Sequence, residues 1–181
     1  KTIITQIDST TSYFGKTAIE VINNLNTSYG YFYNANKLTT IKNSKINIPG
    51  GRVFGDTQIY HLGDDVTLTY DTTPTTNTKS LALCFHGAKN ISMMAVKKVL
   101  TTVTDKPTNL QRFLFEATFK DDKDRIINES LFDNVKVSSA DLLFAGSNII
   151  SINQRLFKID NNIISGQGLF KSCTSLTNLS S

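Results

Sequence analysis

Apolar residues along the chain fall into short groups that open on a phenylalanine and close on aliphatic residues, separated by stretches rich in Asn, Ser and Thr. Eight of the 11 phenylalanines follow an apolar, aromatic or cysteine residue in this way. They are Phe32, Phe54, Phe85, Phe115, Phe132, Phe144, Phe157 and Phe170. The last four are 12, 13 and 13 residues apart, and self-similarity at a near-constant interval predicts stacked repeats.

The clearest two copies span 31–41 and 169–179. In both, one aliphatic residue follows the phenylalanine at +6 and another at +9, as Leu38 and Ile41 follow Phe32. One Phe and two aliphatic residues bury too little apolar surface to offset the entropy of ordering about 25 residues. Neighbouring units must therefore cover one another. The alternative is a globular domain in which the phenylalanine spacing is accidental.

The segment Leu169-Phe170-Lys171-Ser172-Cys173-Thr174-Ser175-Leu176-Thr177-Asn178-Leu179 resembles the unit of the BspA-like leucine-rich repeats. In that family a Phe precedes a few small or polar residues, often including Asn or Cys, and then Leu-x-x-Ile. The resemblance covers 31–181 and is strongest at 31–62 and 131–179. It implies an α/β fold, a leucine-rich-repeat solenoid with short parallel strands and short helices or turns. The strands it implies lie near 38–41, 59–62, 149–152 and 176–179.

The pattern is irregular at the start and in the middle of the chain. Residues 1–30 form an N-terminal flank, in which 17–25 is amphipathic and predicts a helix that caps one end of the stack. Residues 63–80 interrupt the repeat as an insertion, with an alternating strand over 66–70 and a turn-rich stretch after it.

Two further helices are expected on the convex back of the stack. Ser92 can cap the first, which runs to Val103 with its apolar positions at a helical period. Thr108 or Asn109 can cap the second, which runs to Ala117.

Composition excludes some classes of partner. The net charge is +4, but Lys97-Lys98 is the longest cationic pair, so neither a nucleic-acid groove nor an anionic membrane patch is expected. No apolar stretch approaches the roughly 20 residues that span a bilayer, and we expect no membrane insertion. Cys84 and Cys173 are far apart and form no metal-binding spacing, which predicts two buried free thiols. We expect the chain to be a fragment of a longer protein.

The sequence contains no assembled catalytic or metal-binding motif. His61 and His86 lie in different copies, without a neighbouring nucleophile. The acidic run 121–124 lacks the glycine and the closing glutamate of a calcium loop, and predicts a solvated loop. Residues 50–55 lack the Lys-Ser/Thr of a phosphate loop, and the tyrosines at 29–33 predict packing more than binding. We therefore predict no catalytic residue, no metal and no cofactor.

Residues between the two buried anchors of each expected strand point outward, because side chains alternate across a strand. The outward residues are Thr39, Thr40, Tyr60, His61, Ser151, Thr177 and Asn178. If successive copies stack, these side chains form a ladder, broad enough to bind a protein or a glycan through many modest hydrogen bonds.

The resemblance implies a bacterial surface protein or a phage structural protein, because repeats of this class occur in both. We expect a non-enzymatic recognition or adhesion module of an extracellular assembly, most of all a phage tail or fibre protein or a bacterial adhesin, with a protein or glycan receptor. The alternative is a structural assembly or decoration protein of a virion, whose partners are neighbouring subunits, in a homo-oligomer or a larger assembly. A hydrolase also stays open, since folding can bring distant carboxylates together.

Overall fold

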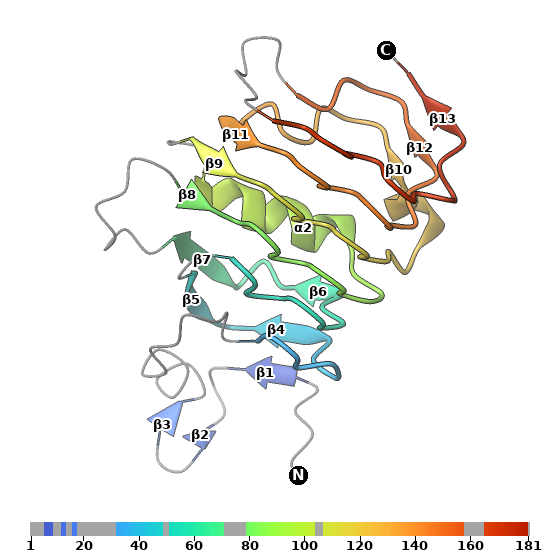
Figure 1. Ribbon diagram of the computed structural model, residues 1–181. Helices are drawn as coiled ribbons and strands as arrows, with labels where there is room; N and C mark the ends of the chain where they lie inside the picture. The colour runs from blue at the N-terminus through green and yellow to red at the C-terminus, as the bar shows by residue number, and fades with distance from the viewer. Residues whose placement is uncertain are drawn as a thin grey trace.

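The computed structural model describes residues 6–8, 12–13, 16–17, 32–48, 51–70, 79–103, 107–157 and 165–180 (Figure 1). Within them, short strands alternate with turns, and one α-helix crosses the middle of the molecule. The strands are β1 (Gln6–Asp8), β2 (Ser12–Tyr13), β3 (Lys16–Thr17), β4 (Thr40–Lys42), β5 (Lys45–Ile48), β6 (His61–Leu62), β7 (Thr67–Tyr70), β8 (Lys79–Ser80), β9 (Thr108–Asn109), β10 (Ile126–Ile127), β11 (Val137–Ser139), β12 (Ser151–Ile152) and β13 (Asn178–Leu179). The helices are α2 (Met93–Leu100) and the 3-10 helices η1 (Thr101–Val103) and η2 (Asp122–Arg125).

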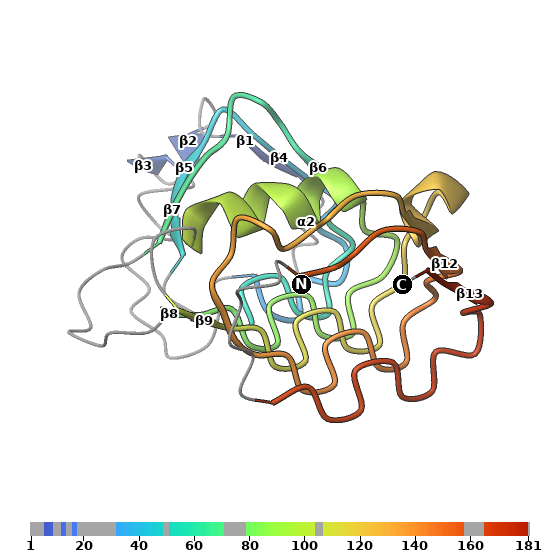
Figure 2. The ribbon, with the colours of Figure 1, turned by 90° about the horizontal axis from the view of Figure 1, so that it is seen from above.

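Six-residue turn segments stack on one another along one side of the molecule. The complete segments are 51–56, 82–87, 111–116, 141–146 and 167–172, and residues 32–34 match the last three positions of a sixth. Between successive segments, backbone N–H groups at even positions donate to carbonyls at odd positions of the next segment. Phe54 N, for example, donates to Cys84 O at 2.9 Å and Phe85 N to Phe113 O at 2.9 Å. Figure 2, which looks along the stack, shows these turns aligned at one edge.

The fourth position of each turn segment faces the core. It is held by Phe32, Phe54, Phe85, Leu114, Phe144 and Phe170. The Phe32 and Phe54 rings stack at a centroid distance of 5.6 Å, those of Phe54 and Phe85 at 5.5 Å, and those of Phe144 and Phe170 at 5.6 Å. Large aromatic side chains that cover one another in this way remove much apolar surface from water.

Segment 111–116 exchanges the two core positions. Leu114 takes the fourth position and Phe113 the third, and both are fully buried. The Phe113 ring consequently meets Phe85 edge to face, at 5.4 Å and an interplanar angle of 80°. Phe115 lies outside the core, half-buried and stacked on His86 at 5.3 Å. Its place among the core phenylalanines, expected from the sequence, is wrong, because the neighbouring Phe113 fills that volume.

The interval of 12 to 13 residues has a different origin from the one expected. Phe144 and Phe170 belong to successive turn segments, whereas Phe132 and Phe157 stack on each other at 5.3 Å in a second pair. Phe132 also meets Phe144 edge to face at 6.2 Å. The short interval is therefore half of one coil, which carries two core phenylalanines.

All strand pairs except β2–β3 are parallel. The three-stranded sheets have the orders β1-β4-β6, β10-β12-β13 and β11-β9-β8, and β5 pairs with β7. The strands expected near 38–41, 59–62, 149–152 and 176–179 are confirmed as β4, β6, β12 and β13, each in the C-terminal part of its predicted range. Their anchors are fully buried in β4 and β6, where Ile41 pairs with Leu62.

The helix expected after Ser92 is confirmed as α2, followed by η1. The Ser92 hydroxyl accepts a hydrogen bond from Ala95 N at 3.2 Å, which satisfies one of the free N–H groups of the first turn. Val96, Val99 and Val103 are fully buried beneath it.

The second helix, expected from Thr108 or Asn109 to Ala117, is wrong. The Asn109 side chain does accept a hydrogen bond from Gln111 N at 2.8 Å, but it starts a turn segment in place of a helix. Arg112 and Glu116 have φ angles of 54°, in the left-handed region, so the chain cannot continue as a helix there. The spacing of three and four residues between apolar side chains comes from two consecutive turns.

The flank and the interruption both contribute strands. β1 pairs in parallel with β4, and β7 pairs in parallel with β5 over four residues, from Lys45 opposite Thr67 to Ile48 opposite Tyr70. Part of 63–80 is therefore a regular part of its coil, while 71–78 lies outside the described residues. Of the helix expected at 17–25, Thr17 ends β3 and the remainder lies outside the described residues. Among the described residues, no helix has the length and apolar character needed to cross a bilayer.

The stacked fourth position should dominate stability. We expect Phe54→Ala to lower the free energy of unfolding by about 3–5 kcal/mol, because it opens a cavity between two buried rings. Phe54→Leu should cost roughly 1 kcal/mol, since leucine already fills this position at residue 114 and nearly conserves volume. Denaturant unfolding followed by circular dichroism measures both. Equal costs for the two variants would show that the ring is not held between its neighbours.

Candidate functional site

The seven outward residues expected from the sequence, which we call the strand face, fall into two groups in the structure. Thr39 and Thr40 lie beside Tyr60 and His61: Thr40 is in register with His61, and Tyr60 N donates to Thr39 O at 3.0 Å. These four side chains are half-buried. The second group is Ser151, Thr177 and Asn178, on β12 and β13. The coil that contains α2 and the loop before β10 lie between the two groups (Figure 1).

Tyr60 is held by two residues from a distant part of the chain. Its hydroxyl donates to Asp121 Oδ2 at 2.6 Å, and Lys120 Nζ lies 4.3 Å from the centre of its ring. The hydrogen bond to Asp121 raises the pKa of Tyr60, and burial and the negative charges of Asp121 and Asp124 add to this effect. Tyr60 is thus a fixed part of the surface, with its hydroxyl already engaged.

The acidic run 121–124 differs from the solvated loop expected from the sequence. Asp121 binds Tyr60, and Asp124 Oδ2 accepts a hydrogen bond from Met93 N at 3.0 Å, at the first residue of α2. A carboxylate is favourable at a helix N-terminus, and α2 has no acidic residue in its own first turn. Asp122 pairs with Arg125 at 2.9 Å. These carboxylates anchor η2 between β6 and α2. The distance along the chain hides this role from any local sequence pattern.

Beside the second group, three asparagines form a side-chain ladder that sequence reasoning missed. Asn153 Nδ2 donates to Asn128 Oδ1 at 2.7 Å, and Asn178 Nδ2 donates to Asn153 Oδ1 at 3.0 Å. Ser151 joins this amide ladder, because its hydroxyl donates to Asn153 and accepts from Asn178 at 3.3 Å. Ser151 is consequently buried, whereas Thr177 and Asn178 are exposed. The signal in the sequence is an interval of 25 residues between successive asparagines.

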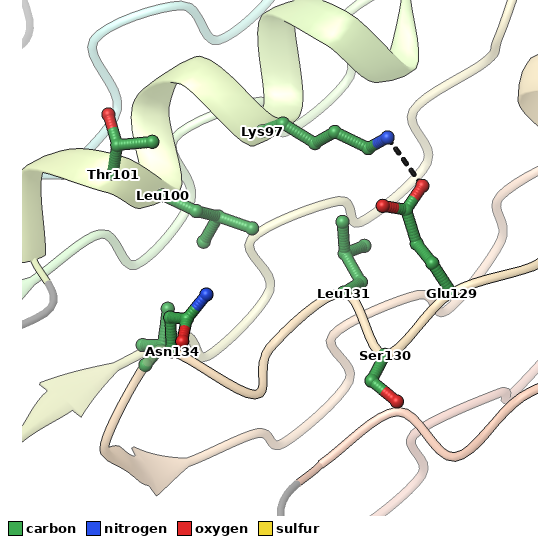
Figure 3. Close-up of a pocket in the computed structure, with 8 residues that line it drawn as sticks. Lys97, Leu100, Thr101, Glu129, Ser130, Leu131 and Asn134 are labelled. Carbon is green, nitrogen blue, oxygen red and sulfur yellow. Dashed lines mark ion pairs between the residues drawn. The ribbon is translucent and has the colours of Figure 1, made fainter.

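A hollow lies between α2 and the chain from 123 to 135, next to the amide ladder. It consists of two adjoining cavities of about 360 and 230 Å³, which share Lys97 and Glu129. Lys97 Nζ and Glu129 Oε1 form an ion pair across the hollow (Figure 3). Leu100 and Leu131 line the smaller cavity, and Met94, 47% exposed, lines the larger. Asn128 belongs to both the larger cavity and the ladder, so the two features are continuous.

The thiols and imidazoles have structural surroundings. Cys84 is fully buried, and burial raises the pKa of its thiol to about 12, so it stays protonated and unreactive near neutral pH. Cys173 is half-buried and its thiol donates to Phe144 O at 2.9 Å. Both cysteines are free, as expected, but only Cys84 is fully buried. His86 stacks on Phe115, and among the described residues no three His, Cys, Asp or Glu side chains are arranged to hold a metal ion.

The chain was compared with protein-family models, curated proteins and solved structures, and none of them matches it. The argument for function therefore depends on the geometry of the surface.

The contact between Tyr60 and Asp121 predicts a tyrosine that ionises late. In an alkaline titration followed by tyrosinate absorbance, Tyr60 should ionise at a higher pH than an ordinary tyrosine, because ionisation breaks its hydrogen bond and opposes two carboxylates. The Tyr60→Phe variant identifies its contribution. Asp121→Asn should move that contribution to lower pH, whereas Asp122→Asn, which removes a carboxylate paired with Arg125, should leave it almost unchanged. An equal response to the two substitutions contradicts the assigned contact.

Proposed function

We propose that the chain is a non-enzymatic recognition module of an extracellular assembly. In this proposal it is a BspA-like leucine-rich-repeat solenoid of a phage tail or fibre protein or of a bacterial surface adhesin, and the strand face binds a protein or glycan receptor. The observation that carries the proposal is the regular polar array on β12 and β13. There, Asn178 and Asn153 are held in line by side-chain hydrogen bonds, one coil apart.

The fixed geometry of this array supports recognition. A side chain that is already ordered loses little conformational entropy when a partner binds, so its remaining hydrogen-bonding groups contribute more of their energy to affinity. Thr40 and His61, in register on β4 and β6, extend the array to the other group of the strand face. The hollow beside Asn128 adds exposed apolar surface at Met94 to the polar rim, a combination typical of interfaces.

Binding to intact bacterial cells tests the strand face. We expect the combined variant Thr40→Ala, His61→Ala, Thr177→Ala and Asn178→Ala to lose about tenfold or more in apparent affinity, since several hydrogen bonds of about 1 kcal/mol each are removed. Fluorescently labelled protein and flow cytometry give the affinity, and a printed glycan array shows whether the receptor is a saccharide.

The matched control replaces Lys45 and Thr67 by alanine. These two residues are also exposed register partners on a parallel pair, but they lie on β5 and β7. The control should bind as well as the unmodified chain. Unchanged binding of the strand-face variant, or an equal loss in the control, would exclude the strand face as the receptor site.

A second candidate function is the assembly role, and the edge of the last described coil favours it. Leu179 on β13 is 56% exposed, and Phe170 and Leu176 are only partly buried, although the equivalent residues of earlier coils are fully buried. Within the described residues β13 has β12 as its one partner, so its outer edge presents backbone groups that can pair with another strand.

Sedimentation of the chain over a range of concentrations tests this candidate. If the edge is an assembly surface, we expect concentration-dependent association that Leu179→Lys abolishes, because a charge at the centre of an apolar contact is costly. A monomer at every concentration would contradict association of this chain with its own copies.

A further inference from the structure

The outer surface of the turn segments carries a second line of side chains. At the fifth position of each segment the side chain points away from the core. The line is Tyr33, Gly55, His86, Phe115, Ala145 and Lys171. It contains aromatic rings, and cations lie over two of them: Arg52 Cζ is 5.8 Å from the centre of the Tyr33 ring, and Arg112 Cζ is 5.5 Å from that of Phe115. Figure 2 shows that this side of the molecule is distinct from the one that carries β12 and β13.

Two positions of this line have little or no side chain, and the structure treats them differently. At Gly55 the neighbouring ring fills the space: a Cβ added to Gly55 would lie 2.9 Å from Cδ2 of Tyr33. At Ala145 the corresponding neighbour is Phe115, which stacks on His86 of the preceding segment with an interplanar angle of 15°. One face of the Phe115 ring is therefore covered, and the opposite face borders the space above Ala145.

That space is a notch of about 250 Å³ between segments 111–116 and 167–172. Its floor is Ala145 and Gly146, which separate the two flanking segments by the thickness of one coil. Phe115 and Arg112 line one wall, and Lys171 and Ser172 line the other. Glu116 crosses its edge, since a Cβ added to Gly146 would lie 3.0 Å from Glu116 Cγ, and the φ of +71° at Gly146 also disfavours a side chain there.

These groups define the chemistry of a ligand. The face of an aromatic ring attracts the positively polarised C–H groups of a flat, saturated ring. A guanidinium binds a carboxylate through two parallel hydrogen bonds, and an ammonium adds a second positive charge. A carboxylate and a hydroxyl, from Glu116 and Ser172, can accept from or donate to sugar hydroxyls. The volume is below that of a pocket for a drug-sized ligand, and suits a single ring.

We propose that this notch binds a hexuronic acid residue of an acidic polysaccharide. The sugar ring lies against Phe115 over Ala145, and its carboxylate lies between Arg112 and Lys171. The inference is independent of the strand face, because the two surfaces share no residue. Binding at the notch would add a saccharide contact to a molecule whether it serves recognition or assembly.

Amide chemical shifts of the isotope-labelled chain, titrated with D-glucuronate, test the proposal. We expect the resonances of 112–116 and 142–146 to move in a saturable manner. D-glucose, which lacks the carboxylate, and acetate, which lacks the ring, should each bind about tenfold more weakly. Arg112→Gln should weaken glucuronate binding about tenfold, and Arg112→Lys should weaken it less, because it keeps the charge and loses the planar fork.

The matched control is Arg52→Gln. Arg52 occupies the same position of segment 51–56 and also lies over an aromatic ring, but the notch beside it is filled by Tyr33. This variant should bind glucuronate like the unmodified chain, as should the strand-face variant. The proposal is overturned if glucuronate moves no resonance of the notch, if acetate binds equally well, or if Arg52→Gln and Arg112→Gln lose the same affinity.

Discussion

Parallel backbone pairing between successive six-residue turn segments is the constraint on which the structure depends. Each segment turns the chain twice while its even-positioned N–H groups bind odd-positioned carbonyls of the next segment. Buried backbone groups must be paired, and this ladder pairs them on the side of the molecule where no regular strand or helix exists. It also aligns the fourth residues, so that the rings of Phe54 and Phe85 meet at 5.5 Å. The return path between segments can then vary: it contains the pair β5–β7 in early coils and α2 in a later one.

The same turns carry a conformational cost that explains their outer surface. Their second and sixth positions have positive φ, which suits Gly87, Gly146 and Gly168. Leu83 and Leu142 adopt it with φ of 63° and 54°, at roughly 1–2 kcal/mol for each non-glycine residue. The interstrand-like hydrogen bonds and the buried phenylalanines offset this cost. Side chains in this conformation, and those at the fifth position, project outward at one-coil intervals, so the strained backbone and the notch above Ala145 have one origin.

Part of this architecture can be predicted from the sequence. The phenylalanine followed by aliphatic anchors locates β4, β6, β12 and β13, and Ser92 marks the start of α2. Other features follow from ambiguity or distance. A double turn and a helix both place apolar residues three and four positions apart, so Leu110, Phe113 and Leu114 predict a helix that does not form. On the strand face, Tyr60 and Asp121 are 61 residues apart, and the burial of Ser151 depends on asparagines of other coils. No local pattern contains these contacts.

The function proposed for the molecule requires that this framework holds its outer side chains at fixed intervals. Hydrogen exchange of the native chain, measured residue by residue by nuclear magnetic resonance, tests that rigidity most directly. If the pairing between turn segments sustains the fold, the amide protons of Phe54, Phe85, Leu114 and Phe144 exchange only through global unfolding, with a free energy equal to that from denaturant titration. Exchange of these four amides as fast as that of exposed turn residues would contradict the account.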